Sequence, residues 1–158
     1  MELDRTKIGA AIGRIPSGCS ILTAQHAGRS SGVLVSWVQQ AAFEPPAVSV
    51  ALRRGRPIVG LIDGSGRFLL NLIDENPTAM FKHFGKGFSL DDDAFGGLGV
   101  EQTEYGPALS ACIARMGCRV LERVTVGDHD LYLGEVESGG VVEGAHPYVH
   151  IRANGLNY

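Results

Sequence analysis

Three arginines follow an apolar segment in the first half of the chain, where Arg53, Arg54 and Arg56 fall within four residues. Pro57 comes next and opens a short helical pattern. A guanidinium group can hold a phosphate through two hydrogen bonds, and the free N–H groups of a helix start add partial positive charge. The cluster therefore predicts an anion site, and the alternative is a solvated loop with ordinary surface arginines.

Two apolar runs precede the arginines, at residues 33–38 and 48–52, and their β-branched and aromatic side chains are typical of strands. Pro45 and Pro46 lie between the runs and forbid continuous sheet pairing through that turn. We therefore expect two strands that meet at a rigid corner. An apolar wall beside a cationic turn suits a flat aromatic ligand with a phosphate tail.

The cysteines and histidines favour neither disulfides nor a metal site. Cys19, Cys112 and Cys118 are odd in number and form no C-x-x-C pair, so we expect reduced thiols. His146 and His150 are four residues apart in a predicted strand, which places both on one face. A metal pair is conceivable there, but no third ligand is evident, so the pattern favours polar strand histidines.

Length and composition narrow the class of protein. The chain has 158 residues, is 44% hydrophobic and 20% charged, and carries a formal net charge of −3, which fits a single domain over residues 1–158 with a real core. No apolar run approaches the roughly 20 residues that span a bilayer, and polar residues follow Met1, so we expect a cytoplasmic protein with no membrane association. A mildly acidic balance without a broad basic stripe argues against nucleic acid as a partner.

Hydrophobic periodicity and turn residues predict many short strands and a few helices. We expect helices at residues 4–15, 57–63 and 77–84, a polar turn at 25–31, an irregular segment at 86–106, turns at 127–129 and 139–140, and strands at 20–24, 33–38, 48–52, 67–73, 108–119, 120–126, 131–136 and 148–152. This pattern indicates a mainly β protein built as an antiparallel barrel.

Several short motifs follow one another along the chain in a recognisable order. They are IPSG at 15–18, GVLVSWV at 32–38, FEPP at 43–46, FLLNL at 68–72, GDH at 127–129, and HIR at 150–152 with the residues through Tyr158. Together they span nearly the whole chain. In their order and spacing the chain resembles the flavin reductase family with the FMN-binding split-barrel fold, most closely the reductase module at the C-terminus of cyanobacterial flavodiiron proteins.

The resemblance implies a mainly β, antiparallel Greek-key split barrel with a few short helices. It also implies an NAD(P)H:flavin oxidoreductase that binds FMN, or FAD, and transfers hydride from the nicotinamide nucleotide to flavin for a downstream acceptor. That acceptor is expected to be a flavin-consuming oxygenase or an electron-acceptor protein. The implied assembly is a homodimer with the flavin near the subunit interface. The sequence lacks the di-iron and flavodoxin-like portions of the fused relatives, so we expect a reductase module standing alone.

Two alternatives stay open. The first is a flavoredoxin-like FMN electron-transfer protein, which has the same fold but retains its flavin and passes electrons to a protein partner. The second is a β-barrel binding module without flavin.

The resemblance places the flavin along the first strand and the arginines. Backbone groups of Val35, Ser36, Trp37 and Val38 would meet the pyrimidine edge of the isoalloxazine ring, and donors there would favour the reduced, anionic ring. Trp37 would stack nearby, although a lone Trp in an apolar strand also suits a core position. The phosphate would lie near two arginines and adjoining main chain, namely Arg53, Arg56, Ala51 and Leu52. Alternating side-chain directions favour these two arginines over Arg54.

Two further residues complete the predicted site. Asn71 interrupts an apolar strand and must find hydrogen-bond partners if it is buried. Either the ribityl chain or main chain at the flavin site, or a turn in the core, would satisfy it. His129 is the expected catalytic residue, because the resemblance places it where the nicotinamide stacks on the flavin. Without the resemblance, Gly127-Asp128-His129 is typical of a hairpin turn in which the aspartate bonds its own backbone.

Overall fold

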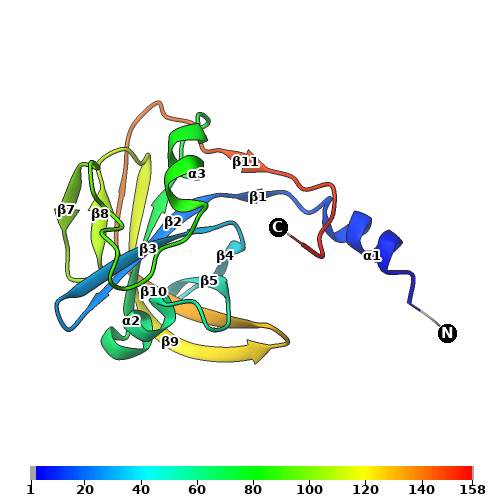
Figure 1. Ribbon diagram of the computed structural model, residues 1–158, viewed down its shortest axis with the longest axis horizontal. Coiled ribbons are helices and arrows are strands. Elements are labelled where there is room, and N and C mark those ends of the chain that lie inside the picture. The colour runs from blue at the N-terminus through cyan, green and yellow to red at the C-terminus, as the bar shows by residue number, and fades with distance from the viewer. Residues whose placement is uncertain (1–2, 158) are drawn as a thin grey trace.

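Strands outnumber helices in the computed structural model, which describes residues 3–157 (Figure 1). In chain order the elements are α1 (Arg5–Ile12), β1 (Ser17–Gly18), β2 (Ser20–His26), β3 (Arg29–Val35), β4 (Val38–Phe43), β5 (Pro46–Arg53), α2 (Ile58–Ser65), β6 (Arg67–Leu72), α3 (Thr78–Phe84), β7 (Val100–Gln102), β8 (Pro107–Leu109), β9 (Ala114–Val126), β10 (His129–Val141) and β11 (Val149–His150). The predicted mainly β architecture with a few short helices is confirmed. None of the helices in this described part is long and apolar enough to span a membrane.

Closure of the main sheet follows from its strand order. Seven antiparallel strands run β3-β2-β6-β9-β10-β5-β4, and β7-β8 and β1-β11 form separate pairs. If the seven strands lay flat, about 4.8 Å apart, the edges β3 and β4 would be about 29 Å from each other. Only Ser36 and Trp37 join these two edges, and the three steps from Val35 to Val38 cover at most about 11 Å. The sheet must therefore curl into the predicted split barrel, with the split at Ser36 and Trp37, which we call the seam.

The seam corrects the predicted strand at residues 33–38, which is divided between β3 and β4. Val35 pairs with Ser20 of β2, whereas Val38 pairs with Val50 of β5, so the two halves join opposite edges of the barrel. The predicted rigid corner at the prolines is a hairpin instead. Pro46 is the first residue of β5 and pairs with Phe43, a position where a strand tolerates proline, and the preceding Glu44–Pro45 bond is cis.

Two predicted interruptions of strands were wrong, and one predicted turn is shorter than expected. The expected turn at residues 25–31 narrows to a tight hairpin in which only Ala27 and Gly28, with φ of 49° and 77°, separate β2 from β3. The expected breaks at 119–120 and 139–140 do not interrupt β9 and β10, each of which is continuous over 13 residues. Gly139 and Gly140 lie within the paired part of β10, opposite Met116 and Arg115 of β9.

The core of the barrel lies between the curled faces of the sheet. Phe68 and Tyr132 are its largest fully buried side chains, and α2 covers one end through Ile58, Leu61 and Ile62. A second cluster forms where α3 packs on β3 through Phe84. Close contact there requires glycine at position 32, because a Cβ would lie 2.8 Å from the Phe84 ring. This packing holds α3 beside the seam.

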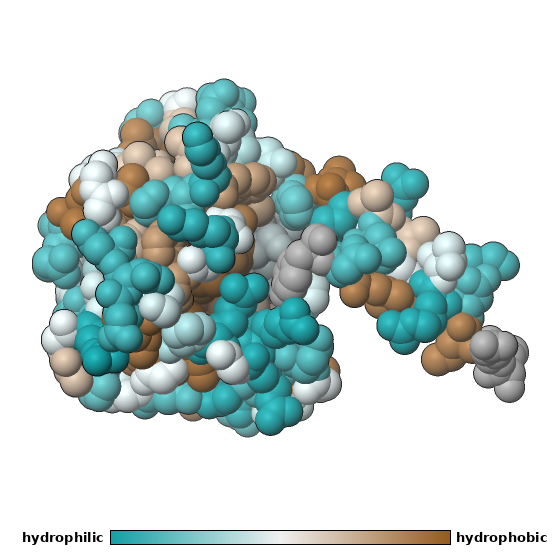
Figure 2. Space-filling view, in the orientation of Figure 1, coloured by the Kyte–Doolittle hydropathy of each residue, from teal (hydrophilic) through white to brown (hydrophobic). Residues whose placement is uncertain are grey.

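Both chain ends form a projection that we call the arm, residues 3–18 and 149–157 (Figure 1). Asp4 caps α1, accepting a hydrogen bond from the Lys7 N–H at 3.1 Å. The helix is shorter than the predicted span of residues 4–15, and its apolar residues Ile8 and Ile12 are each 37% exposed. Figure 2 shows the arm standing away from the body with hydrophobic residues on its surface.

Backbone hydrogen bonds hold the two halves of the arm together. The N–H groups of Arg152 and Gly155 donate to the carbonyls of Gly13 and Gly9, at 3.2 and 2.7 Å. The short strands β1 and β11 pair with each other at the place where the arm meets the barrel. The predicted final strand at 148–152 is therefore limited to Val149 and His150, and the residues beyond it form an extended tail against α1.

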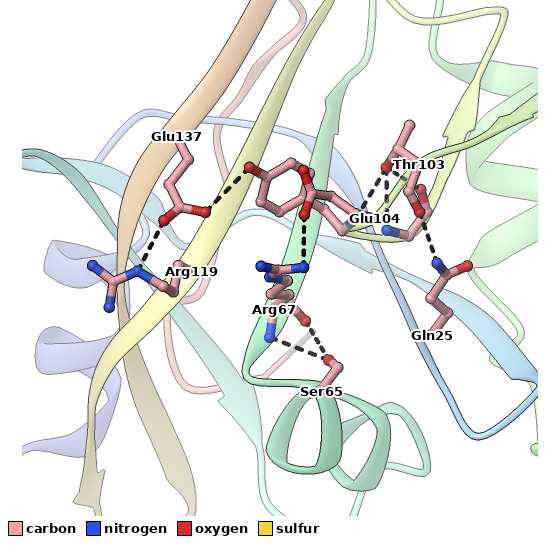
Figure 3. A network of polar contacts seen from close by, with 9 residues as sticks. Gln25, Ser65, Arg67, Thr103, Glu104, Arg119 and Glu137 are labelled. Atoms are coloured by element: carbon pink, nitrogen blue, oxygen red, sulfur yellow. Dashed lines mark hydrogen bonds and ion pairs between the residues drawn. The ribbon is translucent and has the colours of Figure 1, made fainter.

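The irregular segment before β8 is fastened to the barrel by a polar network (Figure 3). Gln25 Nε2 donates to the Thr103 carbonyl at 2.7 Å, and Arg67 pairs with Glu104 at 2.7 Å. The Tyr105 hydroxyl donates to Glu137 at 3.1 Å, and Arg119 Nε donates to the other oxygen of that carboxylate at 2.9 Å. Residues 103–105 are thus tied to the barrel wall through side chains of β2, β6 and β10.

We expect Tyr105→Phe to lower the free energy of unfolding by about 1 kcal/mol, because it removes one hydrogen bond without changing the packing of the ring. Urea denaturation followed by circular dichroism measures this change. Tyr148→Phe is the matched control, since within residues 3–157 the Tyr148 hydroxyl has no recorded hydrogen bond. Equal destabilisation by the two variants would contradict the role assigned to the Tyr105 hydroxyl.

Candidate functional site

A cleft of about 520 Å³ opens along the seam, within the size range of small-molecule sites. We call it the seam cleft. Its lining comes from β2 and β3, the seam, the end of β5, the start of α2, α3 and the arm: Cys19, Val33, Leu34, Val35, Ser36, Trp37, Ala51, Leu52, Arg53, Arg56, Phe81, Phe84, Gly85, His150 and Arg152. Most of these residues are apolar. The arginines come from the end of β5 and the turn after it, which carry Arg53 and Arg56, and from the arm, which carries Arg152.

The seam supplies backbone groups outside the regular ladder. Ser36 and Trp37 belong to neither β3 nor β4, so they have no ladder partner of the kind that their neighbours have. The Trp37 carbonyl accepts a hydrogen bond from the Ala51 N–H at 3.0 Å, which ties the seam to β5. Val35 and Val38 keep their strand partners, so within residues 35–38 only Ser36 and Trp37 leave the regular pairing. Such a break lets main-chain donors and acceptors meet the edge of a flat heterocycle.

Arg53 and Arg56 lie in the wall of the seam cleft, at the end of β5 and just before α2. Arg54 lies between them in the chain and is not part of that wall. Its N–H donates to the Asp128 carbonyl at 3.0 Å, which joins this turn to the β9-β10 hairpin. The structure thus places the two arginines favoured by strand alternation at the cleft, together with Ala51 and Leu52.

His129 reaches the same region from β10, where it pairs with Arg53 across the strands. Its ring lies 4.6 Å from the Trp37 ring, centroid to centroid, at an interplanar angle of 36°. His129 Nδ1 lies 2.8 Å from Asp128 Oδ1, and this hydrogen bond is the main reason that the pKa of Asp128 is lowered. Because an ionised carboxylate only accepts, Nδ1 carries the hydrogen in this bond.

A second cleft, of about 870 Å³, lies between the barrel and the arm, and we call it the arm cleft. It is lined by Arg5, Trp37, Ala51, Arg53, Val126, Asp128, His129, Leu131, Arg152, Gly155, Leu156 and Asn157. Trp37, Ala51, Arg53 and Arg152 line both clefts. The two spaces therefore adjoin at Trp37, with His129 on the arm-cleft side.

A buried ion pair fixes the hairpin that carries His129. Asp130 is fully buried and accepts from Arg123 at 2.5 Å and from the Thr125 hydroxyl at 2.7 Å. These contacts, led by that of Arg123, lower the pKa of Asp130 and keep it ionised. Arg123 also pairs with Asp63 of α2. The hairpin is thereby held at its base, one residue from His129.

Other predicted residues lie apart from the clefts. Asn71 is fully buried in the core, where its amide donates to the Ile21 carbonyl at 3.0 Å and to the Thr23 hydroxyl at 3.3 Å, and its oxygen accepts from the Leu109 N–H. The structure thus favours the core alternative for Asn71, because its hydrogen-bonding groups are occupied within the protein. Val38 is half-buried in β4 and lines neither cleft.

The sequence analysis missed three residues at the clefts. Arg152 was part of the terminal motif but had no assigned role, and its guanidinium lies 5.2 Å from the centroid of the Trp37 ring. Arg5 reaches the arm cleft from α1. Cys19 lines the seam cleft, where burial raises its pKa to about 11 and keeps the thiol protonated. No local signal identified these residues, because the arm brings them to the site from the two ends of the chain.

The fold and clefts define a split-barrel protein with two adjoining clefts that share Trp37 and Arg53. A family model described as flavin reductase like domain matches residues 12–155. The chain belongs to this family. A relative, putative diflavin flavoprotein A 3 of Synechocystis sp., is 34% identical over 159 residues, which cover 99% of this chain and 27% of that protein. The chain thus spans only 27% of that relative's length.

Solved structures show the same fold. The NADH:FAD oxidoreductase SgcE6 of Streptomyces globisporus C-1027 matches with a TM-score of 0.86 at 17% identity, covering 98% of this chain and 94% of that one. The styrene monooxygenase flavin reductase of Pseudomonas putida S12 matches with a TM-score of 0.76 at 25% identity, covering 91% of each chain. The predicted resemblance to flavin reductases and the split-barrel fold are confirmed.

Proposed function

We propose that the protein is an NAD(P)H:flavin oxidoreductase that holds FMN in the seam cleft and passes its electrons to a downstream acceptor. The observation that supports this proposal most is that two features occur in the same cleft. The seam offers main chain outside the ladder, and Arg53 and Arg56 lie in the same wall. A flavin needs both, because its ring has a hydrogen-bonding edge and its tail ends in a phosphate.

The residues present fit FMN without further groups. Ser36 and Trp37 would meet the pyrimidine edge, and Val35 and Leu52 provide apolar wall beside it. The phosphate would be held by Arg53 and Arg56, for which no carboxylate partner is recorded within residues 3–157. When bound, the flavin supplies the hydride-accepting chemistry, and the protein supplies binding and orientation.

His129 is the proposed catalytic residue because it faces the arm cleft beside Trp37. The hydrogen bond between Nδ1 and Asp128 orients the imidazole, which would in turn position the carboxamide of the nicotinamide. Orienting the nicotinamide in this way contributes through proximity, since hydride transfer requires donor and acceptor to be close and aligned. His129 need not exchange a proton in this role.

The acceptor and the assembly are also part of the proposal. Named neighbours include a flavin reductase of a styrene monooxygenase, which supports a flavin-consuming oxygenase as the acceptor, and an electron-acceptor protein would use the same reduced flavin. The exposed apolar side chains of the arm, Ile8, Ile12 and Ile15, support a homodimer.

Spectroscopy and steady-state kinetics test the function. We expect purified protein mixed with FMN to show a perturbed flavin spectrum and to oxidise NADH or NADPH with multiple turnovers of added free flavin. A perturbed spectrum with turnover only when a protein partner is added would instead identify an electron carrier. No change in the flavin spectrum would reject flavin binding and favour a different ligand for the barrel.

A further inference from the structure

The arm cleft has a cationic wall assembled from three distant parts of the chain. Arg5 comes from α1, Arg53 from the end of β5, and Arg152 from the tail that follows β11. Among the residues of 3–157 that line this cleft, Asp128 is the only one with a side-chain carboxylate, and it is hydrogen-bonded to His129. The lining therefore carries an excess of positive charge, in a protein whose formal net charge is −3.

Five of the seven other arginines are paired with carboxylates; within residues 3–157, Arg14 and Arg54 have no such pair either, and they line neither cleft. Arg29, Arg67, Arg115, Arg119 and Arg123 each have a carboxylate within 4 Å, and none of these five lines either cleft. Within residues 3–157, no such pair is recorded for the arginines of the two clefts, which are Arg5, Arg53, Arg56 and Arg152. A paired guanidinium serves the fold, whereas an unpaired one at a cleft can bind an anion through several N–H groups.

Arg152 is held in place by the arm rather than left free in solvent. Its guanidinium lies 5.2 Å from the centroid of the Trp37 ring and donates to the Asn157 carbonyl at 3.2 Å. Its own N–H is bonded to Gly13 of the other half of the arm. A guanidinium stacked on an aromatic ring keeps its outer N–H groups available in a fixed direction.

We propose that the arm cleft binds the pyrophosphate of a dinucleotide through Arg5 and Arg152, with Arg53 shared between the two clefts. This inference rests on the proposed function, because it assigns the part of the nicotinamide nucleotide that lies beyond the ring at His129. A pyrophosphate carries two negative charges close together, which suits guanidinium groups converging from separate elements. The volume of about 870 Å³ also exceeds what a nicotinamide ring alone requires.

Trp37 makes the inference testable without measuring turnover. It is the only tryptophan in the chain and lines both clefts, so its fluorescence reports a ligand in either. The probe is ADP-ribose, which carries the pyrophosphate without nicotinamide or flavin. We expect Arg5→Ala to raise the dissociation constant of ADP-ribose about tenfold, and the Arg5→Ala/Arg152→Ala double variant about a hundredfold, from losses of about 1.4 kcal/mol per guanidinium.

Arg14→Ala is the matched control, because Arg14 lies exposed in the arm and lines neither cleft. We expect it to bind ADP-ribose like the wild type. Arg5 is the diagnostic residue, since it lines only the arm cleft and its removal should leave the FMN dissociation constant within about twofold. Arg5→Lys, which keeps the charge, should recover part of the lost affinity.

The outcomes separate this inference from the proposed function. If FMN binds but ADP-ribose does not, or if Arg5→Ala and Arg14→Ala bind ADP-ribose equally, the pyrophosphate site is overturned and the flavin site stands. If FMN itself fails to bind, the proposed function falls first. Parallel titrations with NAD⁺ and FAD identify the source of the pyrophosphate, because only the dinucleotide that uses the arm cleft should lose affinity in Arg5→Ala.

Discussion

Replacing Arg53 and Arg56 together with alanine is expected to raise the dissociation constant of FMN at least a hundredfold. Each guanidinium that holds a phosphate contributes about 1.5–3 kcal/mol through charged hydrogen bonds, and about 1.4 kcal/mol corresponds to a tenfold change in affinity. Both side chains lie in the wall of the seam cleft. Quenching of FMN fluorescence during titration with protein measures the constant directly.

Two controls make this result specific to the phosphate. Arg54→Ala should bind FMN like the wild type, because Arg54 lies in the same turn but is not part of the cleft wall. Riboflavin, which has the ring without the phosphate, should lose little affinity for the double variant. An unchanged FMN constant, or equal losses for riboflavin and FMN, would reject the assignment of the phosphate to these arginines.

His129→Ala is expected to slow flavin reduction by NADH or NADPH about tenfold to a hundredfold, with FMN affinity nearly unchanged. The physical reason is loss of orientation, since a misplacement of about 1 Å between reacting groups can cost about a hundredfold in rate. Stopped-flow absorbance of the bound flavin after mixing with the reduced nucleotide gives the rate of this step. The binding constant comes from the same fluorescence titration.

Asp128→Asn serves as the companion variant, because it preserves the shape of the turn and alters the partner of His129 Nδ1. We expect it to slow reduction less than His129→Ala does, since the ring remains stacked beside Trp37. Reduction traces of His129→Ala that superimpose on those of the wild type would remove the proposed role of His129 with the nicotinamide.

The sequence predicted which strands form the barrel better than it predicted the residues at which those strands begin and end. Alternating and apolar runs mark strands because burial of a sheet face has a period of two residues, and this signal is local. Turn prediction failed at residues 139–140, where two adjacent glycines lie inside β10. There they pair with Met116 and Arg115 of β9, and a local pattern does not contain that pairing.

The candidate site shows the same contrast between local patterns, which the sequence reveals, and contacts between distant residues, which it does not. The cluster at Arg53 and Arg56 was visible because its members are neighbours in the chain, and strand alternation separated them from Arg54. The flavin site was one predicted location for Asn71, because a polar residue in an apolar strand needs hydrogen-bond partners. In the structure those partners are Ile21, Thr23 and Leu109. Sequence reasoning identified the demand and left open which groups would meet it.

Residue types and their spacing by themselves predicted a mainly β barrel and an anion site at the turn after β5, whereas the role of His129 in the GDH turn came only from the resemblance to a family. Only the tertiary structure decided that β3 and β4 part at the seam, that His129 stacks beside Trp37, and that Arg5 and Arg152 close a second cleft. The reason is that strand patterns are encoded within a few residues, whereas closure of a seven-stranded sheet and docking of both chain ends depend on contacts between residues far apart in sequence.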